Sequence, residues 1–294
     1  RVLTLKEVSL RKGKRTYLDE VSFTAQAGRI TAIVGPRSAG RTELVRVIMG
    51  LIAPDEGTVK LEDFELDFGD RQNFGYLPSE RGGYPNMRVI DQIVYLARLH
   101  GITLGAAERN ALTLLSRLEL ADRGYAPLKN LSGTEIARVD IAATLAADPD
   151  VVVIDDAFSG LDSQSTELVI SLLRAHAASG VPVIVATDNW EAAQAHADDV
   201  VVLNQGRTSV SGSVQELRSD VKYRVEVADA EAAAESLDKR TGISDVAVLD
   251  SEDSVISFRA SDADSAAQTV AALNGVKSFE SVRPTLAEQY KEAL

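Results

Sequence analysis

The sequence predicts an α/β domain over residues 1–213, followed by a small α+β domain over residues 214–294. Three observations indicate this division. Up to about Arg207, short apolar runs alternate with helical patterns. One of these runs, Ile30 to Val34, ends in a glycine-rich turn that leads into a helical pattern. After Gly212 the order becomes strand, helix, two strands, helix and strand.

The elements of the first domain follow from its apolar runs. Apolar runs that interleave with helices predict a central sheet that is largely parallel and buried on both faces. The expected strands are Ile30–Val34, Val151–Ile154, Val181–Ala186 and Val200–Leu203, and the expected helices are Glu43–Met49, Val89–Leu99 and Thr166–Ala178.

The second domain is predicted to be ferredoxin-like, because its order is βαββαβ. We place the boundary near Val214 to Asp220. A short helix, Leu286 to Leu294, closes the chain. The expected strands are Tyr223–Val227, Val246–Leu249, Val255–Phe258 and Val276–Val282, with a hairpin around Ser251–Ser254 and helices at Ala230–Leu237 and Ala263–Leu273.

Composition excludes some classes of function. The net charge of -13 argues against nucleic acid as the main partner, because phosphate backbones need clustered Lys and Arg. Cysteine is absent, so disulfides and thiolate metal sites are excluded. No apolar run approaches the roughly 18 residues that a membrane-spanning helix needs. Work at a membrane would therefore require a partner that spans it.

The glycine-rich turn has the pattern of a Walker A phosphate-binding loop. A strand before it and a helix after it are the context that this motif needs. Gly35 and Gly40 allow a tight turn whose N–H groups point at one phosphate, and Thr42 stands where a hydroxyl holds Mg²⁺. A plain strand–helix turn is the simpler alternative. The expected nucleotide-binding residues are Gly35, Pro36, Arg37, Ser38, Ala39, Gly40, Arg41, Thr42 and Glu43.

An apolar strand ends in two acids, Asp155 and Asp156. Unpaired charge at the end of a buried strand is expensive, which favours a binding role. Asp155 fits the Walker B acid that positions Mg²⁺. Asp156 stands where a Glu orients the attacking water, and it is one methylene shorter. Two acids that are simply solvated are the alternative.

With these motifs placed, the chain resembles the ATP-binding subunits of ABC transporters. Within that family, the Glu80-Arg81-Gly82 form is similar to exporters of the ABC-2 type, the NatA/YhaQ-like group. The remaining motifs are a signature (Leu131-Ser132-Gly133-Thr134-Glu135), a D-loop (Ser159-Gly160-Leu161-Asp162), a Q-loop segment (Phe74–Pro85), a closing strand pair (Val200–Arg207) and a C-terminal segment (Pro284–Glu288).

The resemblance implies a P-loop NTPase (ABC ATPase) domain with a helical subdomain, peripheral at the cytoplasmic face of the cell membrane. ATP and Mg²⁺ would bind between Walker A of one subunit and the signature of a second subunit. Closure of this pair would drive an integral membrane permease. The expected metal ligands are Thr42, Asp155 and Ser79, and the expected signature contacts to the partner's ATP are Ser132, Gly133, Thr134 and Glu135.

Several positions depart from the family pattern. Arg41 replaces the Walker A Lys, and Asp156 replaces the catalytic Glu. Asp188 replaces the switch His, so that a carboxylate would face the γ-phosphate. Ser79 occupies the Q-loop position. The aromatic residue that usually stacks on adenine is missing, and Tyr17 is a possible substitute.

The signature departs as well, with Thr134 and Glu135 in place of Gly and Gln. Ser132 and Glu135 also have the spacing of a capping box, which is the structural alternative. Glu135 would repel a partner's phosphate unless it turns inward.

These departures favour impaired hydrolysis, with Asp156 and Asp188 as the altered catalytic positions. The chain would bind ATP as half of a homodimer or of a heterodimer with a competent partner. One alternative is a soluble nucleotide-responsive scaffold or regulator without a motor role. Another is a fully active homodimeric ATPase.

Overall fold

The computed structural model describes residues 1–67, 69–218, 221–250 and 254–291. It divides into two compact units, Arg1–Val214 and Gln215–Leu294. Among the described residues, no helix has the length and apolar character that a membrane crossing requires.

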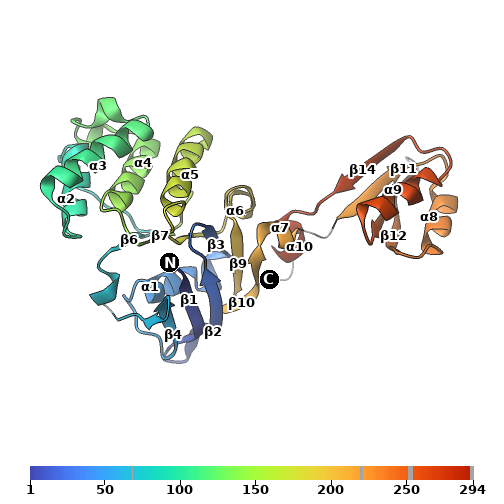
Figure 1. Ribbon diagram of the computed structural model, residues 1–294, viewed down its shortest axis with the longest axis horizontal. Coiled ribbons are helices and arrows are strands. Elements are labelled where there is room, and N and C mark those ends of the chain that lie inside the picture. The colour runs from blue at the N-terminus through green and yellow to red at the C-terminus, as the bar shows by residue number, and fades with distance from the viewer. Residues whose placement is uncertain (68, 219–220, 251–253, 292–294) are drawn as a thin grey trace. The chain divides into compact units, whose positions relative to one another are not determined.

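Unit 1 contains two sheets and their helices (Figure 1). Its strands are β1 (Leu3–Lys12), β2 (Arg15–Ala25), β3 (Ile30–Val34), β4 (Glu56–Leu61), β5 (Phe64–Glu65), β6 (Phe74–Leu77), β7 (Val151–Asp155), β8 (Val183–Thr187), β9 (Asp199–Asn204) and β10 (Arg207–Ser213). Its helices are α1 (Arg41–Ile48), α2 (Val89–Arg98), α3 (Leu104–Arg117), α4 (Gly133–Leu145), α5 (Ser163–Ala177) and α6 (Trp190–His196), with single 3-10 turns at Arg37–Ala39, Gly69–Arg71, Ala121–Arg123 and Leu128–Asn130.

The larger sheet confirms the predicted α/β class. Within the described part of the chain its order is β10-β9-β3-β8-β7-β6, and every neighbouring pair is parallel except β9 and β10. All residues of β3, β7 and β8 are buried, as expected for strands covered on both faces. Because these strands run in parallel, their carboxyl ends meet at one edge. That edge receives the glycine-rich turn, Asp155 and Asp188.

A second sheet, with the order β2-β1-β4-β5 in the described residues, is antiparallel. The sequence prediction did not include it as a separate sheet. Its strands expose one face, so charged residues interrupt their apolar runs. Leu44, Val45 and Ile48 of α1 belong to one core cluster with residues of both sheets. The antiparallel sheet therefore covers the outside of the helix that follows the turn.

The helices α2, α3 and α4 pack on one another and form the predicted helical subdomain (Figure 1). Most predicted boundaries differ from the observed ones by a few residues. The helix expected from Thr166 begins at Ser163, because the Asp162 side chain accepts from the Ser165 N–H at 2.8 Å and caps it earlier.

Unit 2 has the order βαββαβ, preceded by α7 (Val214–Leu217). The sheet of its described residues has the order β12-β13-β11-β14 with antiparallel neighbours, which is the split βαβ arrangement. Its core includes Tyr223, Val225, Ile256 and Phe258. The closing helix is observed over Leu286–Tyr290, and the residues expected after 291, like 251–253 of the expected hairpin turn, lie outside the described residues. The elements are β11 (Lys222–Glu226), α8 (Ala230–Asp238), β12 (Ile243–Asp250), β13 (Val255–Ala260), α9 (Ala263–Ala271), β14 (Ser278–Val282) and α10 (Leu286–Tyr290).

Candidate functional site

The glycine-rich turn joins β3 to α1 at the carboxyl edge of the larger sheet. Gly35 has no space for a side chain, because a Cβ there would overlap the Leu203 carbonyl oxygen. Gly40 has φ +96°, and a Cβ there would lie 2.6 Å from the Tyr17 carbonyl oxygen. Both glycines are therefore required by the close packing of backbone around the turn. The backbone of the turn is therefore held in one conformation by its packing.

The N-terminus of α1 is open. Its N-cap residue is Gly40, and no side chain makes a capping hydrogen bond. The first N–H groups of a helix have no partner inside the helix, and they carry a partial positive charge. Such an end attracts an anion.

Arg41 adds a buried cation at the same place. Its side chain is 6% exposed. Among the described residues, its Nε and Nη1 atoms have no hydrogen-bond partner. Buried donors without an acceptor are rare and costly, so they indicate a missing ligand that carries acceptor oxygens. A phosphate group fits this requirement.

The acidic strand end lies beside the loop. The Thr42 hydroxyl donates to Asp155 Oδ2 at 2.8 Å, and Asp155 is buried. A hydroxyl and a carboxylate are hard oxygen ligands, of the kind that Mg²⁺ takes together with phosphate oxygens. Within the described residues, however, no group of three or more His, Cys, Asp or Glu gathers to hold a metal by itself. The pair fits a metal that arrives with a phosphate-bearing ligand.

Asp156 takes a left-handed backbone conformation with φ +56°. Its carbonyl oxygen accepts from Arg81 Nη2 at 3.0 Å. In the described part of the structure its carboxylate has no hydrogen bond or ion pair, so it is free to accept from a ligand or from water. Non-glycine residues with positive φ are uncommon, and a strained backbone next to a free acid is typical of functional sites.

Arg81, which follows β6, was not singled out as a site residue by the sequence. Its guanidinium lies 3.0 Å from the Asp156 carbonyl oxygen and 3.4 Å from those of Asp155, Ser159 and Pro78. It therefore ties the segment after β6 to the acidic strand end and to the turn that follows. Arginine in a loop has no periodic pattern that would have revealed this.

The carboxylate of Asp188 lies close to the glycine-rich turn. Its Oδ2 lies 3.8 Å from Arg37 Nε and 3.9 Å from Arg41 Nη2. The expected carboxylate is therefore present at this edge, but it is paired with two arginines of the loop. One feature of the sequence could have indicated this pairing: Arg41 and Asp188, which both depart from the family pattern, carry opposite charges in the same predicted site.

The predicted signature begins α4, and its N-terminus is closed. Ser132 Oγ accepts from the Glu135 N–H at 3.3 Å, and Glu135 Oε2 accepts from the Ser132 N–H at 2.8 Å. Arg123 Nε pairs with Glu135 Oε1 at 3.2 Å. The Ser132 N–H and Arg123 hold the pKa of Glu135 below its ordinary value, although partial burial opposes them. The capping-box alternative is thus observed, and Glu135 turns inward.

The rest of the predicted signature lies near this cap. Thr134 Oγ1 is 3.3 Å from Ser132 Oγ, and Gly133 is exposed. Among the described residues, the signature has no hydrogen bond or ion pair with the glycine-rich turn. Each motif therefore belongs to its own helix N-terminus, the turn to α1 and the signature to α4.

Other predicted residues lie near the carboxyl edge of the larger sheet, but their side chains make fewer contacts there. Ser79 is exposed two residues after β6, and the described residues give its side chain no hydrogen bond. Tyr17 touches the loop through its carbonyl oxygen. Its ring carries the Arg15 guanidinium 4.6 Å from the centroid, so one face of the ring is covered. Of the remaining loop residues, Ala39 is buried, Glu43 is half-buried, and Pro36, Arg37 and Ser38 are exposed or at the surface.

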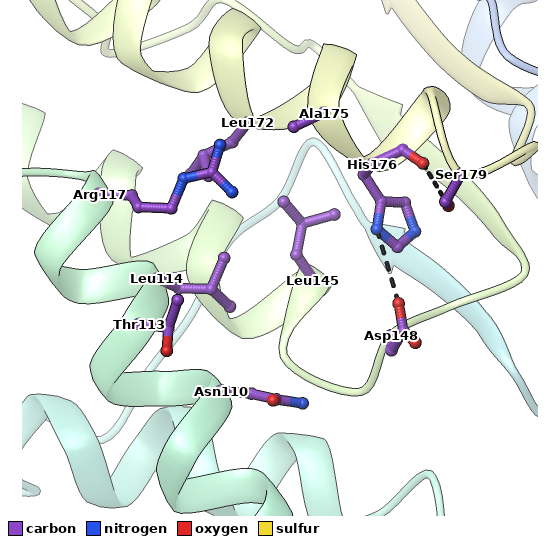
Figure 2. Close-up of a pocket in the computed structure, with 10 residues that line it drawn as sticks. All are labelled: Asn110, Thr113, Leu114, Arg117, Leu145, Asp148, Leu172, Ala175, His176 and Ser179. Carbon is purple, nitrogen blue, oxygen red and sulfur yellow. Dashed lines mark hydrogen bonds and ion pairs between the residues drawn. The ribbon is translucent and has the colours of Figure 1, made fainter.

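A cavity of about 400 Å³ lies elsewhere in unit 1, between α3, α5 and the turn after α4 (Figure 2). His176 Nε2 lies 2.8 Å from the Pro149 carbonyl oxygen, and its Nδ1 lies 3.8 Å from Asp148. Asn110 Nδ2 donates to the Ala146 carbonyl oxygen at 2.7 Å. These contacts hold the turn that leads into β7. None of the predicted site residues lines this cavity.

Comparisons with known proteins agree with this geometry. The protein-family model described as ABC transporter matches residues 18–159. The uncharacterized ABC transporter ATP-binding protein YhaQ of Bacillus subtilis is 28% identical over 217 residues, which cover 74% of this chain and 73% of that protein. The Nod factor export ATP-binding protein I of Burkholderia lata is 30% identical over 214 residues, which cover 72% of this chain and 70% of that protein. The dimeric ATP-binding cassette MJ0796, solved in a post-hydrolysis state with ADP and Pi, has a TM-score of 0.64 at 22% identity and covers 72% of this chain and 98% of its own; this likeness concerns the fold.

Proposed function

The chain belongs to the ABC transporter family, as an ATP-binding subunit, and on that premise we propose that it docks on an integral membrane permease and couples nucleotide binding to export. ATP-binding subunits of this family pair with one another and with a membrane permease. Under the proposal, the chain lies at the cytoplasmic face of the membrane. The export direction is supported by the Nod factor export relative.

The observation that carries the proposal is the buried Arg41 guanidinium, with two donors that lack partners, beside the uncapped start of α1. This arrangement supports binding of a nucleotide's phosphates. Thr42 and Asp155 would hold Mg²⁺ together with those phosphates, and Ser79 stands at the same edge. A bound Mg²⁺ supplies charge neutralisation at the phosphate oxygens.

We further propose that hydrolysis is impaired. Asp156 has a free carboxylate, but its side chain is one methylene shorter than the Glu of the family pattern. A displacement of about 1 Å at a water-orienting group lowers a rate by roughly 100-fold. Asp188 adds a carboxylate, paired with Arg37 and Arg41, where the pattern has a hydrogen-bond donor. Both changes leave phosphate binding possible and disfavour the chemical step.

Coupling to the permease would run through Arg81. A cavity of about 280 Å³ lies between the segment after β6, α2 and α4, and Arg81, Gln92 and Asp140 are among the residues that line it. An occupant of this cavity would contact Arg81, whose guanidinium reaches the Asp156 carbonyl oxygen. We therefore place the permease contact there.

For unit 2 we propose an accessory role in pairing with a second subunit. β14 is an edge strand of its sheet, and Phe279 and Val282 are 42% and 41% exposed. Exposed apolar side chains on an edge strand favour pairing with another chain.

A nucleotide-responsive scaffold without a transport role is the second candidate, and the closed signature helix favours it. In this case the chain would bind nucleotide and not associate with a permease. Co-purification in detergent with a co-expressed permease of the ABC exporter type separates the two candidates.

The test is nucleotide binding and turnover by the purified chain, alone and with its permease. We expect Mg-ATP to bind and turnover to be roughly 100-fold below that of an ABC ATPase with intact motifs. An Asp156→Glu variant should raise the turnover and leave nucleotide affinity unchanged. Rapid turnover by the wild-type chain would contradict impaired hydrolysis, and absence of any nucleotide binding would contradict the proposed function itself.

A further inference from the structure

The Asp188 carboxylate occupies the anion position of a buried cation. The Arg41 side chain is 6% exposed, whereas that of Asp188 is 48% exposed. Arg37, which is 84% exposed, meets the same carboxylate oxygen. Asp188 thus lies between the buried guanidinium of Arg41 and the exposed guanidinium of Arg37. A phosphate that enters the loop would approach the same guanidinium that this carboxylate faces.

The backbone on both sides of Asp188 is held in place. The Gly35 N–H donates to the Thr187 carbonyl oxygen at 3.4 Å, which ties β8 to the start of the loop. On the other side, the Asn189 N–H donates to Thr187 Oγ1 at 3.0 Å, and Asn189 Oδ1 accepts from the Ala192 N–H at 2.9 Å, which caps α6. An Asp side chain is short. The backbone of Asp188 therefore stays near the loop, and its carboxylate can move only by rotation of this short side chain.

Asp188 balances the charge of Arg41 but does not satisfy its donors. The contact of 3.9 Å is longer than a hydrogen bond, and Nε and Nη1 lack partners in the described structure. A phosphate oxygen can take these donors while Asp188 keeps its place. Because Arg41 stands at the Walker A position that reaches the last phosphates of a nucleotide, the end of the phosphate chain must lie beside Asp188.

We propose that Asp188 sets the nucleotide preference of the loop, which holds a nucleoside diphosphate more tightly than a nucleoside triphosphate. This inference rests on the proposed nucleotide-binding function. A triphosphate brings one more ionised phosphoryl group toward a carboxylate whose backbone is held in place, and like charges repel. A diphosphate leaves the ion pairs of Asp188 with Arg37 and Arg41 intact. Since Asp188 is nearly half exposed, solvent screens part of the repulsion.

The test is equilibrium binding of ADP and of ATP, measured by calorimetry in EDTA and again with Mg²⁺, on the full chain. We expect the wild-type chain to bind ADP about tenfold more tightly than ATP, as repulsion at a partly screened site predicts. Asp188→Asn keeps the shape and removes the charge, and it should bring the two affinities close together. Glu191→Gln is the matched control, because it removes an exposed acid three residues further along that has no hydrogen bond or ion pair among the described residues.

The outcomes separate this inference from the proposed function. Equal affinities for ADP and ATP in the wild-type chain would overturn the inference alone, as would a ratio that Asp188→Asn leaves unchanged. A similar change of the ratio in Glu191→Gln would also overturn it, because the effect would then come from net charge. If no variant binds either nucleotide, the proposed function fails and the inference fails with it. Circular dichroism of each variant confirms that the chain is folded.

Discussion

The N-terminus of α1 is open to a ligand, whereas the N-terminus of α4 is closed by side chains of the same chain. Both helices begin with the same backbone feature, a row of N–H groups with no partner inside the helix. At α1 no side chain caps these groups, and Arg41 adds two buried donors without partners. At α4, Ser132 and Glu135 form a capping box, and Arg123 pairs with Glu135.

The difference shows that a helix N-terminus can bind an external anion only where no side chain of the chain already caps it. Glu135 is the anion of α4, so this helix has no need of an external one. In an ABC dimer, α1 would receive the chain's own nucleotide and α4 would face the nucleotide of the second subunit. We infer that the N-terminus of α1 remains able to bind this chain's own nucleotide, whereas the N-terminus of α4 is capped and less able to bind a partner's nucleotide.

The largest expected effect tests the open end. Arg41→Ala should weaken ADP binding by about 100-fold, because two charge-assisted hydrogen bonds of about 1.5 kcal/mol each are lost. Arg41→Lys should lose less, since a positive charge remains. Calorimetry measures both affinities, and thermal unfolding checks that the variants fold. If Arg41→Ala binds ADP as well as the wild-type chain does, the open end is not the phosphate site.

The second effect concerns Asp140 inside α4, behind the closed end. Burial raises the pKa of Asp140 to about 6 from an ordinary 3.8, although the charge of Arg81 opposes the rise. The folded chain therefore binds this proton more tightly than the unfolded chain does. The contribution of Asp140 to the free energy of unfolding falls as the pH rises from about 4 to about 6 and stays low above that range.

Asp140→Asn should remove this loss and stabilise the chain by up to about 3 kcal/mol at neutral pH, with a smaller gain at pH values near 5. Urea unfolding of both proteins at each pH measures the difference. Glu108→Gln, an exposed acid on α3, is the control and should show no such dependence on pH. A gain that is equal at both pH values would show that ionisation of Asp140 is not the cause.

The smallest effect tests the closed end. Glu135→Ala removes half of the capping box and the ion pair with Arg123, and it should lower the free energy of unfolding by about 1 kcal/mol. Glu135→Gln retains a capping side chain and should cost less. Because the pKa of Glu135 is lowered, the contribution of its charge is present at neutral pH and is lost as the pH falls through the folded-state pKa.

Urea unfolding gives these values, and ADP affinity should be unchanged in both variants. If Glu135→Ala weakened ADP binding as much as Arg41→Ala does, the two helix ends would not be independent. The contrast between an open and a closed end would then be wrong.

The parts of the site that are contiguous in the chain could be predicted from the sequence. The strand from Ile30 to Val34, the turn and the acidic strand end each lie within a few residues, so local pattern and chemistry identify them. The antiparallel sheet was missed, because β1 and β2 are half exposed and their apolar residues do not form continuous runs.

Contacts between distant residues could not be predicted in the same way. Asp188 was expected to repel a phosphate, but its pairing with Arg37 and Arg41 depends on side-chain positions across two parallel strands. Glu135 had two possible orientations in the sequence; the local capping box with Ser132 holds it inward, and the ion pair with the distant Arg123 supports that orientation. Asp140 looks like an ordinary polar residue of a helix until the packing of α4 against its neighbours is known.

Arg81 has a consequence for the way in which unit 1 opens. One guanidinium contacts carbonyl oxygens of Pro78, Asp155, Asp156 and Ser159, which belong to two segments far apart in the sequence. Backbone groups that share one donor are released together when that donor leaves. The end of β7 and the segment after β6 should therefore loosen together when this one side chain is removed, even though the sheet hydrogen bonds of β7 remain.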